Sequence, residues 1–169
     1  EMCIGARGEV VATEGVAGMT TFKLSARLGE DMLNVYALFG NSAYTLAAPP
    51  AYQSAMGVDF GGVAAPIIAT SAEAAYDSWF TIGMEDGSGS VSLSAAGLDL
   101  STWTATTPLS ANNGLLFVAP ESGATVTVVV GQVTITSGVY SAVSMGLRGR
   151  PPTNAACPPL PPCVSYTHT

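Results

Sequence analysis

Apolar and polar residues alternate regularly near the start of the chain. Residues 20–28 place an apolar side chain at every second position, which is the period of a strand with one buried face. The expected core face consists of Phe22, Leu24, Ala26 and Leu28. Residues 8–13 predict a shorter strand before it, and the glycines between positions 15 and 18 predict the turn that joins the two.

Further strands follow from similar patterns. Residues 32–39 also alternate. Their expected core face carries Leu33, Val35, Ala37 and Phe39. Residues 124–136 are β-branched almost throughout, and Gly131 within them predicts a bulge or bend. The Ser-Gly pair at 137–138 predicts a hairpin into the next strand.

The middle of the chain is less regular. Proline and glycine break up residues 47–66, which predicts a long irregular connection. Residues 71–76 predict one short helix, because Ser71 is a suitable N-cap and Glu73 lies in its first turn. Residues 77–84 then predict a strand.

Short strands at regular spacing, separated by turns, are typical of an antiparallel β-sandwich or jelly-roll. We therefore expect an all-β fold with a single sandwich domain at residues 15–150. Residues 1–14 are expected to form an N-terminal segment or an exchanged strand. Residues 151–169 contain six prolines and two cysteines, which predicts an extended, polyproline-like tail.

Composition narrows the function. Only 10% of residues are charged, against about 25% in typical globular domains. The chain has twelve acidic and five basic residues, for a net charge of −7. This charge excludes binding to the phosphate backbone of nucleic acids and disfavours binding to anionic membranes. No apolar run reaches the roughly 18–20 residues of a membrane-spanning helix. The chain starts at Glu1, so we expect that a leader was removed or that this is a piece of a longer precursor.

The three cysteines, Cys3, Cys157 and Cys163, all lie in the terminal segments. Cysteines beside prolines indicate disulfides in an oxidising, extracellular or cell-surface location. Cys157 and Cys163 would close a small loop, Cys3 would tie one of them to the other end of the chain, or a bridge would join two molecules. Three free thiols are the remaining alternative, and the spacing leaves all of these open.

Catalysis and metal binding have little support. The only histidine, His168, is the second-last residue, where it is poorly placed for a catalytic triad. A carboxylate pair of the glycosidase type would have to come from Asp59, Glu73, Asp77, Glu85, Asp86 and Asp99. We expect no enzyme activity and no cofactor. The acidic turn at Glu85 and Asp86 is a candidate Ca²⁺ site, with a solvated turn as the alternative.

Aromatic residues divide into two groups. Trp79, Phe80 and Trp103 lie in or near strand-like segments and are expected in the core. Tyr44 and Tyr52 flank the Pro-Pro pair at 49–50 and are expected to be exposed, where they would serve a carbohydrate-binding or adhesin module.

Glycans are expected to be O-linked, because no Asn-x-Ser/Thr sequon occurs. The Pro-rich composition near the C-terminus is typical of O-glycosylated or hydroxylated segments. The candidate residues are Thr153, Pro151, Pro152, Pro158, Pro159, Pro161 and Pro162.

Several segments together carry a resemblance to a known family. They are residues 34–40 (NVYALFG), 49–53 (PPAYQ), 75–83 (AYDSWFTIG), 97–103 (GLDLSTW), 132–138 (QVTITSG) and 146–150 (GLRGR). Over residues 12–150 the chain resembles secreted β-rich repeat domains in uncharacterised cell-surface proteins of algae, other protists and some bacteria, with Tyr-Asp-Ser-Trp as the most specific part. It is more loosely similar to subunits of extracellular, pilus-like filaments. The resemblance implies a structural role and supplies no catalytic residues.

The leading hypothesis is a subunit of an extracellular filament or surface coat whose partners are identical copies. Exchange of a terminal strand between copies would join them head to tail. The assembly residues are expected to be Val10, Val11, Ala12 and Thr13, or the Cys/Pro tail would take that role. A carbohydrate-binding module is the alternative hypothesis, and a hydrolase is the third.

Overall fold

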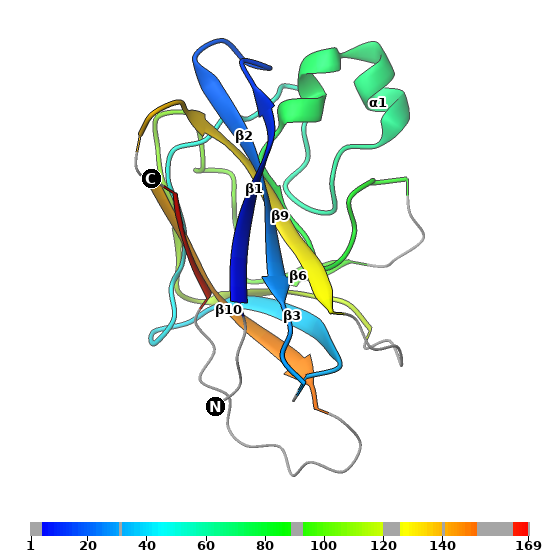
Figure 1. Cartoon of the computed structure of the whole chain (residues 1–169), viewed down its shortest axis with the longest axis vertical. Helices are drawn as coiled ribbons and strands as arrows, with labels where there is room; N and C mark the ends of the chain where they lie inside the picture. Colours follow the sequence, from blue (N-terminus) through cyan, green and yellow to red (C-terminus); the bar gives the residue numbers. More distant parts are fainter. Residues whose placement is uncertain are drawn as a thin grey trace.

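The computed structural model describes residues 5–30, 32–88, 93–119, 126–139, 141–151 and 164–168, the first two and the last five of these by backbone alone. Two antiparallel sheets pack face to face in an all-β sandwich, as the strand pattern predicted (Figure 1). The first sheet has the order β1 (Gly5–Thr13), β2 (Met19–Arg27), β9 (Thr127–Thr136) and β5 (Trp79–Phe80). No helix among the described residues is long and apolar enough to cross a membrane.

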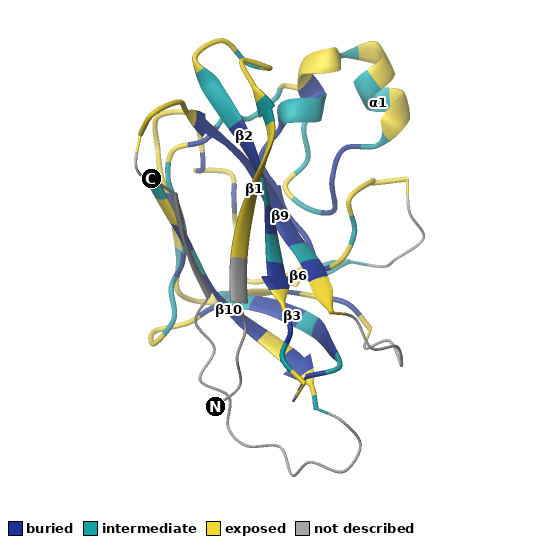
Figure 2. Cartoon of the chain, viewed as in Figure 1, coloured by how far each residue is buried: buried dark blue, intermediate teal, exposed yellow. Residues whose placement is uncertain are grey.

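The second sheet contains seven strands. Its order is β6 (Ser94–Ala96), β8 (Gly114–Phe117), β3 (Asn34–Gly40), β10 (Ser141–Arg150), β4 (Leu46–Ala48) and β7 (Leu109–Ala111), with β11 (Val164–His168) also paired to β10. The strand β3 pairs with the last residues of β10, and β11 pairs with its first residues. The two sheets enclose one large apolar core (Figure 2).

The predicted core face of β2 is confirmed. All four of its apolar residues, Phe22, Leu24, Ala26 and Leu28, are buried between the sheets. In the same sheet, the neighbouring strand β9 is buried over most of its length because a layer of irregular chain covers its outer face.

The predicted core face of β3 is partly wrong. Leu38, expected on the outer face, is fully buried in the core, while Phe39 is only half-buried. Ala37 pairs with Arg148 and Val35 with Gly149, so the ladder passes over Tyr36. Such a bulge shifts the side chains that follow it to the other face of the sheet, and strict alternation along the sequence does not predict this shift.

The bulge expected in β9 is confirmed, but the hairpin after it is wrong. Gly131 pairs with Leu24 and Val129 with Ser25, so the ladder passes over Val130. The strands β9 and β10 belong to different sheets, and the turn at 137–138 therefore links the sheets. A hairpin cannot form there because β9 is already paired with β2 on one side and β5 on the other.

The connecting layer, which we define as residues 49–78, holds both helical elements: α1 (Ala65–Thr70) and the 3₁₀ helix η1 (Ala72–Tyr76). The predicted helix is thus a 3₁₀ turn, Ser71 makes no side-chain cap to it, and α1 was not predicted. The strand predicted after it is reduced to β5. Its ladder to β9 continues through Thr81 and Gly83, whose N–H groups donate to Val130 and Val129.

Candidate assembly edge and the anchor of the connecting layer

The strand β1 lies at the end of the first sheet and pairs only with β2 among the described strands of that sheet. None of residues 7–13 is buried, and Val10 and Val11 are 48% and 45% exposed. In Figure 2 the described part of β1 is coloured mostly as exposed, whereas the centre of β9, two strands away in the sheet, is buried. Backbone hydrogen bonds therefore attach β1 to the domain, while its described side chains contribute nothing to the core.

The residues expected to mediate assembly lie together at the C-terminal end of β1. Val10 pairs with Phe22 and Ala12 with Thr21, so a bulge passes over Val11. Thr13 closes the ladder opposite Thr20. Exposed branched side chains on an edge strand make that edge suited to pairing with another chain.

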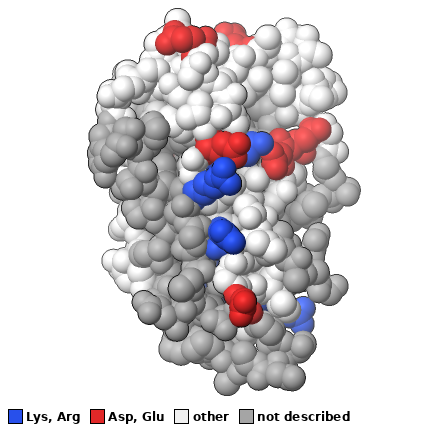
Figure 3. All heavy atoms as spheres, in the orientation of Figure 1, with Lys and Arg blue, Asp and Glu red and all other residues white. Residues whose placement is uncertain are grey.

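Charge along this face is sparse. Figure 3 shows a few basic and acidic groups interspersed among uncharged residues. Arg7 and Glu9 of β1 lie 4.0 Å apart with well exposed side chains, so their ion pair adds little stability. No broad field of one sign repels a second copy from the described part of this face.

The turn after β1 contains a conformation that sequence patterns did not indicate. Glu14 has φ of 60°, in the left-handed region, which Gly and Asn adopt far more readily. Its N–H donates to the carbonyl of Met19, and its carboxylate accepts from the N–H of Gly18, both at 2.9 Å. A Cβ on Gly15 would lie 2.4 Å from the ring of Tyr76, so that ring packs directly on the turn.

The end of the chain also forms an edge strand. β11 pairs antiparallel with β10, from Met145 opposite Val164 to Ser141 opposite His168, and it contacts β1. Within the extended tail predicted for 151–169, residues 164–168 form this strand, while residues 152–163 and 169 lie outside the described residues. Both terminal strands lie along the same side of the sandwich.

The predicted disulfides and most of the predicted glycan sites lie outside the described residues. Cys3, Cys157 and Cys163 are all in this category, as are Thr153, Pro152, Pro158, Pro159, Pro161 and Pro162. Pro151, which follows β10, is half-buried. These assignments stay predictions.

A buried carboxylate, Asp77, anchors the connecting layer. Its two oxygens accept hydrogen bonds from the N–H groups of Ser54, at 2.8 Å, and Val58, at 2.7 Å. Its side chain is buried, and that burial raises the pKa of the carboxyl to about 6, although the backbone N–H bonds act in the opposite direction. Gly57 lies against the carboxylate, where a Cβ would approach within 2.2 Å.

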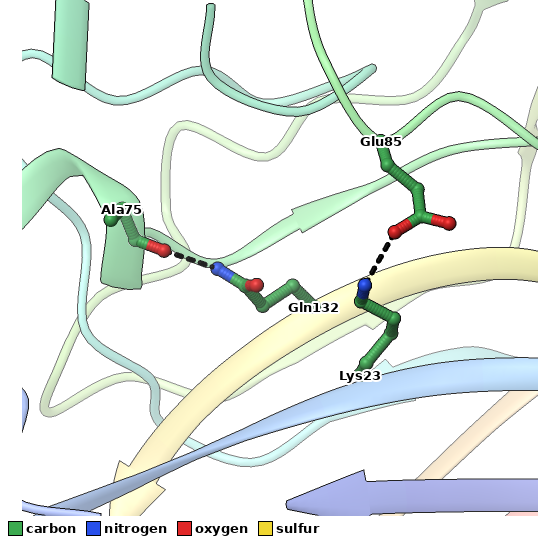
Figure 4. Close-up of polar contacts among 4 residues, drawn as sticks. All are labelled: Lys23, Ala75, Glu85 and Gln132. Carbon is green, nitrogen blue, oxygen red and sulfur yellow. Dashed lines mark hydrogen bonds and ion pairs between the residues drawn. The ribbon is translucent and has the colours of Figure 1, made fainter. Parts of the chain in front are cut away.

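The residues around Asp77 fix the same layer to β9. The side-chain amide of Gln132 donates to the carbonyls of Ala75, at 2.9 Å, and Asp77, at 2.8 Å; Figure 4 shows the first of these bonds. The hydroxyl of Ser78 accepts from the N–H of Thr134 at 3.0 Å. The segment that carried the most specific part of the resemblance, residues 76–79, is therefore an anchor point of the fold.

The other acids are dispersed. Glu85 forms an ion pair with Lys23 of β2, as Figure 4 shows. Asp86 accepts from the N–H of Ser88 at 2.9 Å, and this bond lowers the pKa of Asp86. No group of three or more His, Cys, Asp or Glu side chains gathers in the described ranges, so the calcium site at Glu85 and Asp86 stays a prediction.

Asp99 influences the titration of Asp59. Partial burial, and then the negative charge of Asp99, raises the pKa of Asp59. Asp99 itself is exposed, and its hydrogen bonds with Ser101 lower its pKa. Burial is the main cause that raises the pKa of Tyr52. The negative charge of Glu73, which is exposed on η1, raises it further.

The aromatic core was anticipated from the sequence. Trp79, Phe80 and Trp103 are all buried. The rings of Phe80 and Trp103 stack with centroids 5.3 Å apart, and the indole N–H of Trp103 donates to the carbonyl of Pro49 at 2.8 Å. Tyr44 and Tyr52, expected to be exposed, are half-buried.

No family model, curated protein or solved structure matches this chain. The resemblance to secreted repeat domains therefore stays a prediction, and the functional argument depends on the geometry of the chain itself.

Proposed function

We propose that this protein is a structural subunit of an extracellular filament or cell-surface coat, and that copies join head to tail by exchange of β1. The observation that carries the proposal is the way β1 is attached. It is an edge strand, its described side chains stay outside the core, and it is held by its ladder to β2 and by its contact with β11.

This attachment makes exchange inexpensive in free energy. Removal of a strand that fills a core would expose apolar surface at about 25 cal/mol per Å². Removal of β1 instead leaves the buried faces of β2 and β9 in contact with the opposite sheet, and opens one row of backbone N–H and C=O groups along β2. A strand from a second copy satisfies that row by β-augmentation.

The direct test compares two truncations of the full chain by electron microscopy and sedimentation. Deletion of residues 1–14 removes β1 and is expected to abolish filaments while leaving a folded monomer with its buried tryptophans intact. Deletion of residues 1–4 keeps β1 and serves as the matched control, which is expected to polymerise.

Two further results complete the test. A synthetic peptide of residues 5–13 is expected to bind the longer truncation, because it restores the missing ladder. If the chain without residues 1–14 still forms filaments, assembly does not depend on β1 and this route is wrong.

We also propose that the Pro-rich segment after β10 carries O-linked glycans, at Thr153 or on hydroxylated prolines. Composition supports this, since Pro-rich stretches with hydroxyl groups are typical glycan carriers. Intact mass and peptide mapping of native material test it. Unmodified peptides throughout residues 151–169 would contradict it.

A further inference from the structure

The turn between β1 and β2 stores conformational strain next to the strand proposed for exchange. Glu14 is the single non-glycine residue with positive φ in the described part of the chain. A residue with a Cβ is about five- to thirtyfold less populated in that conformation than in its right-handed counterpart. The closed turn persists because the two hydrogen bonds of Glu14, to Met19 and from Gly18, offset the strain.

We propose that Glu14 is the hinge of strand exchange, so that β1 of one copy opens at this residue and pairs with the edge of β2 in the next copy. This inference depends on the filament proposal above, and it names the acceptor edge, the partner strand and the residue that moves. The partner is a second copy of this chain.

The choice of partner follows from the ladder itself. In the closed hairpin, β1 pairs with β2 from Gly5 opposite Arg27 to Thr13 opposite Thr20. An exchanged copy makes the same pairs between two molecules, so the acceptor edge and the donated strand already fit each other. The two arrangements differ only in the turn, where opening lets Glu14 adopt an extended conformation. Short hinge loops under strain favour this kind of exchange.

The turn is long enough for the movement. Five extended residues, 14–18, span about 17 Å. Neighbouring strands lie about 4.8 Å apart, so this length carries β1 clear of its own sheet. Opening also separates Gly15 from the ring of Tyr76, which packs against the closed turn.

A series of substitutions at Glu14 in the full chain tests the hinge. Glu14→Asn accepts positive φ more readily and keeps a side-chain oxygen for the N–H of Gly18, so it is expected to raise the concentration needed for polymerisation by up to about thirtyfold. Glu14→Val, which is β-branched, is expected to lower it. Glu14→Gln keeps the backbone cost and an acceptor for the N–H of Gly18, so this control is expected to polymerise like the native chain. Light scattering across a dilution series measures the threshold.

Engineered cysteines report which molecule supplies β1. Arg7 and Ser25 pair directly across the ladder, at a spacing that suits a disulfide. The double variant Arg7→Cys with Ser25→Cys, in a chain whose native cysteines are serine, is expected to give covalent multimers from filaments and cross-linked single chains from monomer. Non-reducing electrophoresis separates the two.

The outcomes distinguish the hinge from the filament. Equal thresholds for the Asn, Val and Gln variants, or filaments in which every cross-link stays within one chain, would overturn the hinge and leave end-to-end assembly standing. Filaments from the chain without residues 1–14 overturn the β1 route itself. A native chain that remains monomeric at every concentration refutes both.

Discussion

The buried carboxylate of Asp77 makes folding stability depend on pH in an unusual direction. Its pKa in the folded chain is about 6, against an ordinary value of 3.8. The folded state therefore binds this proton more tightly than the unfolded state, so the stabilisation from protonation is fully present below about pH 4. It is lost as pH rises through 6. A difference of about two pH units corresponds to roughly 3 kcal/mol.

We predict that the free energy of unfolding rises by about 2 kcal/mol between pH 7 and pH 4.5, and that Asp77→Asn removes this rise. Asparagine cannot ionise. Its amide oxygen accepts from one of the two N–H groups, those of Ser54 and Val58, and its NH₂ group faces the other N–H without accepting from it. The variant therefore loses one hydrogen bond at every pH.

Urea unfolding followed by tryptophan fluorescence measures this difference, because Trp79 and Trp103 are both buried. The raised pKa of Asp59 likewise makes the fold more stable as pH falls. The lowered pKa values of Asp86 and Asp99 instead make it less stable as pH falls, and they act below about pH 4. These groups cancel when native and variant are compared at each pH. Parallel pH profiles for the two proteins would refute the assignment of the slope to Asp77.

Two further predictions concern packing. Gly57→Ala is expected to lower the free energy of unfolding by about 1–3 kcal/mol, because the added Cβ would lie 2.2 Å from the carboxylate of Asp77. The control Gly8→Ala, where nothing lies within 4 Å, is expected to change it by no more than about 0.5 kcal/mol. Equal urea midpoints for the two variants would contradict this prediction. Phe80→Ala is expected to lower the free energy of unfolding by about 3–5 kcal/mol, because its ring is fully buried against Trp103. The control Phe117→Ala, at a residue that is 38% exposed, is expected to lower it by about 1 kcal/mol. If thermal unfolding ranks the two variants in the other order, the stack is not central to the core.

The sequence determined those features that depend on neighbouring residues alone. Alternation along β2 identified its four core residues, because burial on one face of a regular strand requires a period of two. Gly131 marked the bulge in β9, since a missing side chain permits close approach: a Cβ there would lie 2.8 Å from the carbonyl of Trp79. Large aromatics in strand-like segments identified Phe80 and Trp103 as core.

Tertiary structure decided which strands pair, and this choice overrode local patterns. The bulge at Tyr36 depends on the register between β3 and β10, so the core face of β3 could not be read from β3 alone. The turn at 137–138 links two sheets because both neighbours of β9 come from distant parts of the chain.

The candidate site shows the same division. Residues 8–13 were recognisable as a strand, but its position at the sheet edge with exposed side chains is a property of the assembled sandwich. The roles of Asp77 and Glu14 were not predictable, because a buried acid and a left-handed glutamate both contradict the usual preferences of their residue types. Each persists because hydrogen bonds that only the folded chain supplies offset its cost.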